Sequence, residues 1–210
     1  MKTLTFDEIV KKVRAKLDEI GMNESEMMDT DVDNANVDTV IKSNIPEAYR
    51  FISLYADLAF IEGKNGASTS ITIGDDLVAK VTIPSDYLRL VSVRLKSWNS
   101  SCTELIMESS PEYRIASNKW VGGSPYKPVA ALTRTTTGRN IELFKAASKQ
   151  DTLATFTYIP TLADNATSVD VSEQTENAFI YYVAALTLKT FREEISDSYF
   201  VVARNLLGIV

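Results

Sequence analysis

Hydrophobic residues recur at the spacing of an α-helix at both ends of the chain and alternate with polar residues in its middle. Near the start, Thr5 is followed three residues later by Glu8, which is the capping-box pattern that begins a helix. An amphipathic helix is expected to follow this box and to end at Gly21. Its predicted buried face comprises Phe6, Ile9, Val10, Val13, Leu17 and Ile20.

A second helical pattern covers residues 38–60, with hydrophobic and small residues on one broad face. Pro46 lies inside this pattern, and proline cannot donate the backbone hydrogen bond that a helix interior requires. We therefore expect a short turn and then a new helix that starts at Pro46, with Ser43 or Asn44 as its cap. The preceding residues 22–38 are acidic and rich in turn-forming residues, and they are predicted to form a loop.

The segment 70–160 has the alternating pattern of β-strands. In "VAKVTIPSDYLRLVSVRLKSW", residues 78–98, two half-buried strands flank a corner at Pro84. Gly138 marks the tight turn of a predicted hairpin, and Pro111, which follows a serine, is expected to begin one short helix between strands. The predicted strands are residues 71–73, 77–83, 88–97, 102–107, 128–134, 139–144 and 152–158.

The C-terminal part of the chain is predicted to be helical again. Ser172 is a suitable N-cap, and the helix after it, which contains "AFIYYVAALTLKTF", is hydrophobic almost all the way round. A helix without a polar face must be covered on several sides, so we expect it at the centre of a bundle or in a buried subunit interface. "SDSYFVVARNLLGIV" then predicts a last amphipathic helix.

Together these elements predict an α+β fold in which segments far apart in the sequence pack together. Residues 1–62 and 170–210 are expected to form one helical bundle, and residues 70–160 an antiparallel β lobe inserted between them. With 210 residues, 45% of them hydrophobic, the chain has enough apolar side chains for an ordinary packed core.

The composition excludes several kinds of catalytic and metal site. The sequence contains no histidine, which excludes histidine-dependent triads, histidine metal clusters and histidine pH switches. Cys102 is the single cysteine, so neither an intrachain disulfide nor a cysteine-ligated zinc site can form. The usual phosphate-binding, dinucleotide-binding, hydrolase and metalloprotease motifs are absent from the sequence. We therefore expect no enzymatic activity, no cofactor and no catalytic residue, and the alternative that stays open is an enzyme that uses carboxylates or lysine.

The predicted acidic loop contains one pattern that is similar to a calcium-binding loop. Asp29, Asp31 and Asp33 have the spacing of its first, third and fifth ligands. However, the sixth position is Asn34 instead of glycine, and the twelfth is Val40 instead of a bidentate glutamate. Because both the sharp turn and the strongest ligand are missing, we interpret the segment as a flexible loop and predict no metal site.

The net charge of −6 comes from 28 acidic and 22 basic residues, and the basic residues are scattered along the sequence. A protein that grips nucleic acid usually has a basic stripe, so specific DNA binding is not expected. "MKTLTFDEIVKK" lacks the apolar run of a signal peptide, and no stretch has the length of a membrane span. A soluble protein without a membrane partner is predicted.

Four parts of the sequence resemble one known family. They are the helix pair ending in "AYRFISLYAD", the "IPSDYLRLVSVRL" strand corner, the "IELFKAASKQDTLATFTYIPT" strand pair and the closing "ENAFIYYVAALTLKTF" helix. In this order the segments resemble the head-to-tail connector proteins of short-tailed phages, also called adaptor, ring or tail-tubular A proteins. A more distant similarity is to ring proteins of crAss-like gut phages. The resemblance is architectural and covers most of the chain.

The resemblance implies a structural virion protein of the tail or neck, assembled in the host cytoplasm. It implies a homo-oligomeric ring of about twelve copies. The implied partners are a portal protein, tail or further ring proteins, and DNA that passes through the ring without specific binding. The hydrophobic C-terminal helix, the edges of the β lobe and the acidic balance agree with such a ring.

An alternative function is a β lobe that binds a glycan or a peptide within a virion or cell-surface assembly. Trp98, Trp120 and Tyr126 are the aromatic residues that could act as stacking platforms for such a ligand. Otherwise these three side chains are expected to cover a sheet edge or a subunit contact.

Overall fold

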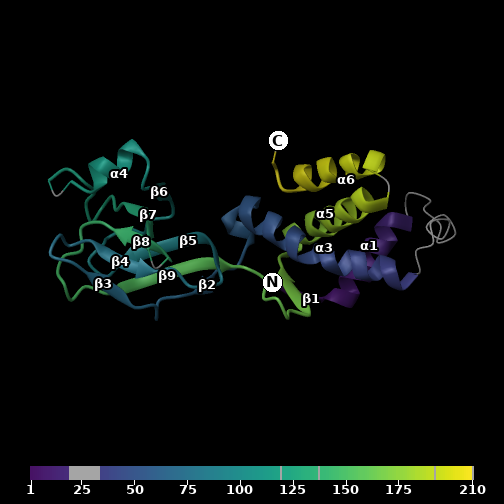
Figure 1. Ribbon diagram of the computed structural model, residues 1–210, viewed down its shortest axis with the longest axis horizontal. Coiled ribbons are helices and arrows are strands. Elements are labelled where there is room, and N and C mark those ends of the chain that lie inside the picture. The colour runs from purple at the N-terminus through teal and green to yellow at the C-terminus, as the bar shows by residue number, and fades with distance from the viewer. Residues whose placement is uncertain (19–33, 119, 137, 192, 210) are drawn as a thin grey trace. The chain divides into compact units, whose positions relative to one another are not determined.

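The computed structural model divides the chain into two compact units (Figure 1). Residues 1–62 and 162–210 form the helical unit, and residues 63–161 form the β unit. The content of helices and strands confirms the predicted α+β fold class. The residues that the structure describes are 1–18, 34–118, 120–136, 138–191 and 193–209.

The helical unit contains most of the helices and one small sheet. Its elements are β1 (Lys2–Thr5), α1 (Phe6–Asp18), α3 (Asn34–Tyr55), η1 (Leu58–Phe60), β10 (Ser168–Val171), α5 (Glu173–Phe191) and α6 (Glu193–Leu206). Its core combines residues from both ends of the chain, because α1 and α3 pack against α5. Residues that come before and after the β unit in the sequence therefore pack together in one core.

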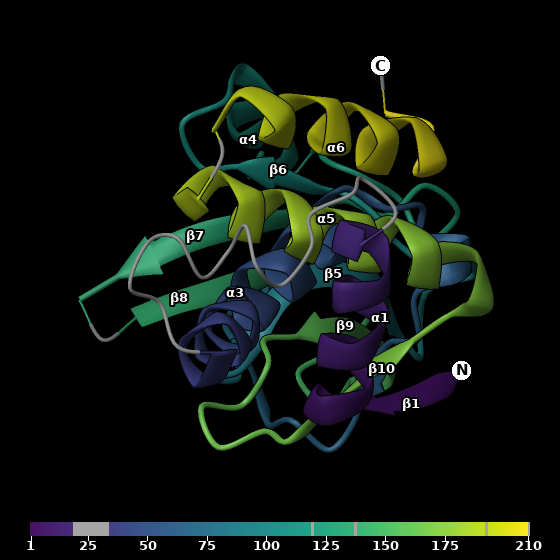
Figure 2. The same cartoon turned by 90° about the vertical axis from the view of Figure 1, so that its right-hand side faces the viewer.

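The start of α1 confirms the predicted capping box. The backbone N–H of Thr5 donates to Glu8 Oε2 at 2.8 Å, and the N–H of Glu8 donates to Thr5 Oγ1 at 3.3 Å. The residues before the box form β1, which pairs antiparallel with β10 (Figure 2). This pairing was not predicted, because each strand has only four residues and the hydrophobic alternation is correspondingly short. It joins the start of the chain to the segment that leads into α5.

One helix replaces the turn and restart that the sequence predicts around Pro46. α3 runs without a break through Pro46, and it begins at Asn34, so residues 34–38 are helical and not part of a loop. Pro46 is exposed, while Ile41, Ile45 and Ala48 on the opposite face are fully buried. Packing of that face against the rest of the core offsets the backbone hydrogen bond that the proline cannot donate.

The hydrophobic helix α5 lies at the centre of the helical unit, between α6 on one side and α1 and α3 on the other (Figure 1). Phe179, Val183 and Leu188 are fully buried there. Of the two predicted environments, the centre of a bundle is correct. The other helices of the same chain therefore cover most of α5.

The described residues of the β unit form two sheets and one short helix. Its elements are β2 (Lys64–Asn65), β3 (Ile71–Ile73), β4 (Ala79–Thr82), β5 (Tyr87–Leu95), β6 (Leu105–Met107), α4 (Pro111–Ala116), β7 (Ala130–Thr135), β8 (Gly138–Leu143) and β9 (Leu153–Pro160). One sheet has the order β2-β9-β5 and the other β3-β4-β8-β7-β6. The predicted all-antiparallel pairing is wrong at one place, because β6 pairs parallel with β7.

The corner at Pro84 moves the chain from one sheet to the other, since β4 and β5 belong to different sheets. The carbonyl of Pro84 accepts a hydrogen bond from the N–H of Tyr87 at 3.1 Å, which closes the turn. β5 then pairs with β9 through several register shifts, so Leu90 and Val93 are buried while Val91 is only half-buried. Both sheets contribute to one hydrophobic cluster, and a smaller cluster lies between α4 and the larger sheet.

Candidate interaction surfaces

One of the three aromatic residues proposed as ligand platforms is buried. Trp98 is 2% exposed in the β-unit core, and its indole N–H donates to the carbonyl of Lys145 at 3.3 Å. The prediction of a platform at Trp98 is therefore wrong, because a ligand cannot stack on a buried ring. Trp120 and Tyr126 are 87% and 77% exposed. They belong to residues 120–127, the aromatic loop, between α4 and β7.

The backbone of the aromatic loop is held in place at both ends. At its start, the side-chain carbonyl of Asn118 accepts from the N–H of Trp120 at 2.9 Å, and its backbone carbonyl accepts from Gly122 at 3.0 Å. At its end, the hydroxyl of Ser100 donates to the carbonyl of Tyr126 at 2.7 Å. The loop therefore holds two large exposed rings on a fixed backbone.

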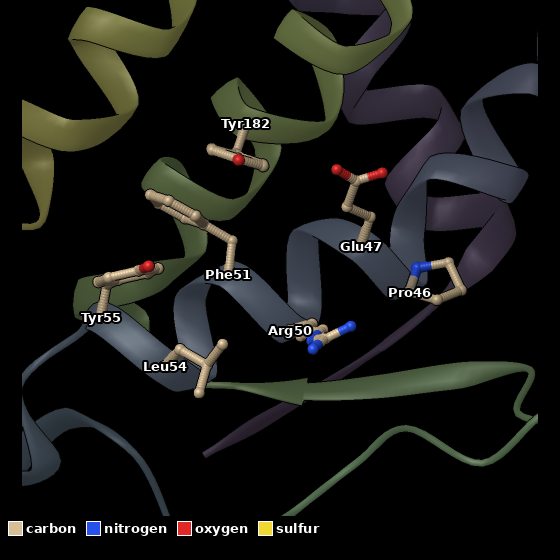
Figure 3. A pocket seen from close by; sticks show the side chains of 7 residues that line it. All are labelled: Pro46, Glu47, Arg50, Phe51, Leu54, Tyr55 and Tyr182. Carbon is tan, nitrogen blue, oxygen red and sulfur yellow. The ribbon is translucent and has the colours of Figure 1, made fainter.

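A groove of about 560 Å³ lies on the helical unit, between α3 and α5 (Figure 3). Phe51 stacks on Tyr182 with ring centroids 4.1 Å apart, and Tyr55 lies 4.8 Å from Phe51 on its other side. Tyr55 is 58% exposed, so the row of rings opens to solvent at that end. The residues lining this aromatic groove are Pro46, Glu47, Arg50, Phe51, Leu54, Tyr55 and Tyr182.

The helical period explains why α3 builds the groove. Glu47, Phe51 and Tyr55 are four residues apart and follow one line along the helix, next to the buried stripe that faces the core. Burial raises the pKa of Tyr182, and the carboxylate of Glu47 raises it further. The Tyr182 phenol is therefore protonated at neutral pH and can donate a hydrogen bond. The groove thus combines aromatic faces with one acidic and one basic side chain, Glu47 and Arg50.

A third exposed hydrophobic surface is on the last helix. Val201, Val202 and Leu206 of α6 are 54%, 38% and 47% exposed. The opposite side of α6 packs on α5, where Ala203 is fully buried. We call these three residues the α6 face.

The ionisable clusters of the β unit are cross-links between strands. Lys64 Nζ and the hydroxyl of Tyr158 donate to the two carboxylate oxygens of Asp86 at 2.6 and 2.8 Å. Burial of Asp86 opposes its ionisation, but the hydrogen bonds from Lys64 and Tyr158 outweigh burial and keep its pKa below the ordinary value. Asp86 therefore fixes the corner after Pro84 to β2 and β9.

A second cluster joins α4 to the larger sheet. The hydroxyl of Tyr113 donates to Glu142 Oε2 at 2.7 Å, and Lys80 Nζ lies 3.3 Å from Glu142 Oε1. Burial, together with the Glu142 carboxylate, raises the pKa of Tyr113 to about 12, so the phenol acts as a hydrogen-bond donor and not as a base.

Burial also raises the pKa of Cys102, whose thiol donates to the carbonyl of Glu104 at 3.0 Å.

The described residues form neither a metal-binding cluster nor a membrane-spanning helix. Within the described ranges, no group of three or more acidic, histidine or cysteine residues is placed to hold a metal ion. Asp29, Asp31 and Asp33, which resemble calcium ligands, lie outside the described residues. None of the helices in the described part of the chain combines the length and the hydrophobicity of a membrane-spanning segment.

The two units have opposite net charges. The β unit contains 12 basic and 8 acidic residues, a net charge of +4, whereas the helical unit contains 10 basic and 20 acidic residues, a net charge of −10. The net charge of the whole chain, −6, is the sum of these two opposite values. The difference comes mainly from the acidic residues, of which 20 belong to the helical unit and 8 to the β unit, whereas the basic residues are divided almost equally.

The fold and these surfaces define a two-unit α+β protein whose exposed aromatic and aliphatic side chains lie on ordered elements. The chain matches no protein-family model and no curated protein.

Proposed function

We propose that this chain is a structural virion protein that forms a ring in the head-to-tail connector below the portal of a short-tailed phage. In this role it joins head to tail, lines the channel through which DNA leaves, and resides in the tail or neck of the virion. The ring contains about twelve copies. Its other partners are the portal and tail or further ring proteins, and DNA passes through it without specific binding.

The observation that supports this proposal best is that each unit exposes large hydrophobic side chains on an ordered surface. In the β unit these are Trp120 and Tyr126, and in the helical unit they are the α6 face and the aromatic groove. Such surfaces are typical of proteins that bury them against partners. The net charge of −10 on the helical unit is suited to a channel wall that must not hold DNA.

The proposal is tested with the full chain and the portal protein encoded in the same genome. Light scattering after size-exclusion chromatography measures the mass of the particles, and negative-stain imaging shows their shape. We expect rings, either in the chain alone or on the portal, and no binding to the portal of an unrelated phage. A chain that stays monomeric and has no affinity for its portal would refute the proposal.

A second candidate function is a β unit that binds a glycan or a peptide, which the exposure of Trp120 and Tyr126 favours. In the Trp98→Phe variant, Trp120 is the remaining tryptophan of the chain, so its fluorescence reports on the aromatic loop alone. A change with soluble oligosaccharides or extended peptides that Tyr126→Ala abolishes would favour this function over the ring. No change with any of these probes would dismiss it.

A further inference from the structure

We infer that the aromatic loop of one copy docks into the aromatic groove of a second copy, so that Trp120 is the anchor of the contact between neighbours. The inference rests on the proposed ring in one respect, since it identifies the surfaces through which the ring is built. The loop belongs to the β unit and the groove to the helical unit. Each copy therefore has one aromatic loop and one aromatic groove.

The sizes of the two surfaces are compatible. A groove of about 560 Å³ is within the range of pockets that enclose most of a bound group. A tryptophan side chain contributes about 150–250 Å² of buried area, more than any other residue type can at one position. Trp120 is 87% exposed, so nearly all of that area is available for burial.

The chemistry inside the groove suits an indole ring. Phe51, Tyr55 and Tyr182 offer aromatic faces and edges, which pair favourably with a further ring. The guanidinium of Arg50 lines the same groove and can lie over the face of tryptophan, the aromatic ring that binds cations best. An aromatic anchor seated among rings and an arginine is typical of interface hot spots.

The charges around the two surfaces are complementary. Residues 120–127 of the loop contain one lysine, Lys127, and no acidic residue. Residues 46–62, which include the groove side of α3, contain three acidic residues and one arginine. Lys127 at the end of the loop and Glu47 on the groove wall are both exposed and form the proposed ion pair. At larger scale, a unit of net charge +4 meets a unit of net charge −10.

The geometry of such a contact allows a closed ring. Loop and groove are different surfaces, so the contact is heterologous, and a pair of copies keeps one unused groove and one unused loop for further neighbours. A stable interface usually buries about 800 Å² on each partner, so the aromatic loop is the anchor of a larger contact. If the same surface of two copies met instead, assembly would stop at a dimer, because neither copy would have that surface left for a third.

The anchor is tested by the association of the full chain, alone and on the portal, in analytical ultracentrifugation. Trp120→Ala is expected to raise the concentration at half-association about tenfold or more. Ile115→Ala removes an exposed side chain from α4, outside the loop, the groove and the α6 face, and serves as the matched control, with little expected change. If Trp120→Ala and Ile115→Ala weaken association equally, or neither does, the anchor is not at Trp120.

The ion pair is tested by exchanging its charges. Lys127→Glu and Glu47→Lys are each expected to weaken association, and a chain with both changes is expected to recover most of the loss, because each contact again joins opposite charges. Asp164→Lys makes the same charge change at another exposed position of the helical unit and controls for net charge. Additive losses in the doubly changed chain would contradict the proposed pairing.

Cysteine cross-linking identifies the occupant of the groove. In a Cys102→Ala background, Val121→Cys on the loop and Arg50→Cys on the groove are joined by a short bismaleimide. A ladder of covalent multimers shows that a second copy occupies the groove. A cross-linked monomer shows that the loop enters the groove of its own chain, and no cross-link above an Asp164→Cys control shows that it does not enter any groove. Both latter results overturn the inference.

These experiments separate the inference from the proposed function. Rings that form on the portal but are unaffected by Trp120→Ala, and give no loop-to-groove cross-link, leave the connector function standing and refute this contact. Loop-to-groove multimers that neither close into rings nor bind the portal support the contact and refute the connector function.

Discussion

Glu176 joins three segments of the helical unit, and its removal gives the most direct test of how that unit is held together. Its carboxylate accepts hydrogen bonds from Lys2 Nζ at 3.1 and 3.2 Å and also from Lys12 Nζ. Lys2 is on β1, Lys12 on α1, and Glu176 in the first turn of α5. We therefore expect Glu176→Gln to weaken the attachment of the N-terminal segment to α5.

The expected loss follows from the burial of the three side chains. A hydrogen bond to a charged group contributes about 1.5–3 kcal/mol when it is well shielded. The side chain of Glu176 is 14% exposed, but those of Lys2 and Lys12 are 48% and 41% exposed, so water competes for both ammonium groups. We therefore expect the loss of the Glu176 carboxylate, the shielded partner of both pairs, to lower the free energy of unfolding by about 1–2 kcal/mol.

The effect has a defined pH dependence. Hydrogen bonding from Lys12 lowers the pKa of Glu176 below its ordinary value of 4.5, burial opposes this, and Lys2 lowers it further. A carboxyl whose pKa is lower in the folded protein stabilises the fold above the unfolded-state value and loses that effect as the pH falls through the folded-state pKa. The difference between the original chain and Glu176→Gln should therefore be full at pH 7 and vanish in acid.

Urea denaturation followed by far-UV circular dichroism measures this difference. At pH 7 the midpoint of the helical unit should fall by about 0.5–1 M in Glu176→Gln. Glu173→Gln, an exposed change in the same first turn of α5, is the matched control and should cost about 0.5 kcal/mol or less, because it weakens only the interaction with the helix dipole. Equal losses in both variants, or a loss that persists in acid, would refute the reasoning.

Three further changes test other parts of the structure. Pro46→Ala restores a backbone donor inside α3 and should raise the free energy of unfolding of the helical unit by about 1–3 kcal/mol in urea; a loss would show that Pro46 does not strain α3. Gly122→Ala would place a Cβ 2.0 Å from the carbonyl oxygen of Ala116, so thermal unfolding should show a β unit less stable by about 2 kcal/mol, and unchanged stability would contradict this crowding. Each single-tryptophan variant reports on the tryptophan that remains. Acrylamide should strongly quench the emission of the exposed Trp120 in Trp98→Phe and only weakly quench that of the buried Trp98 in Trp120→Phe. Equal quenching would contradict the burial of Trp98.

Features that depend on neighbouring residues alone were predicted well from the sequence. The box at Thr5 and Glu8 begins α1 as expected. The short helix α4 begins at Pro111, and the hydroxyl of Ser110 accepts a hydrogen bond from the N–H of Tyr113. Gly138 opens β8 next to the turn, with a positive φ of 146° that side chains rarely adopt. In each case the residues that decide the structure are within a few positions of one another.

Features that depend on tertiary packing were not predicted. Pro46 is tolerated inside α3 because the buried face of that helix is held by residues from the other end of the chain. Register shifts in β5 bury Leu90 and leave Val91 half-buried, which strict alternation cannot foresee. Trp98 and Trp120 have similar local sequences, rich in small and polar residues, yet one is 2% exposed and the other 87%.

The aromatic groove was missed for the same reason. Tyr55 was assigned to the broad face of the helical pattern at 38–60 and Phe51 was not, and only the fold brings Tyr182 from α5 beside Phe51. The opposite charges of the two units could have been counted from the sequence. The charges can be assigned to units only when the unit boundaries are known, because acidic residues from both ends of the chain belong to the helical unit.

The burial of α5 changes the kind of assembly that the chain can form. If α5 were exposed until a neighbour covered it, the subunit would fold only within an oligomer. Because α1, α3 and α6 already cover α5, the helical unit buries its main hydrophobic helix without a partner. The surfaces left for assembly are smaller, aromatic and charged, and such contacts respond to concentration and to salt. Under the proposed function, a subunit with these properties stays dispersed at low concentration and assembles where the portal gathers many copies.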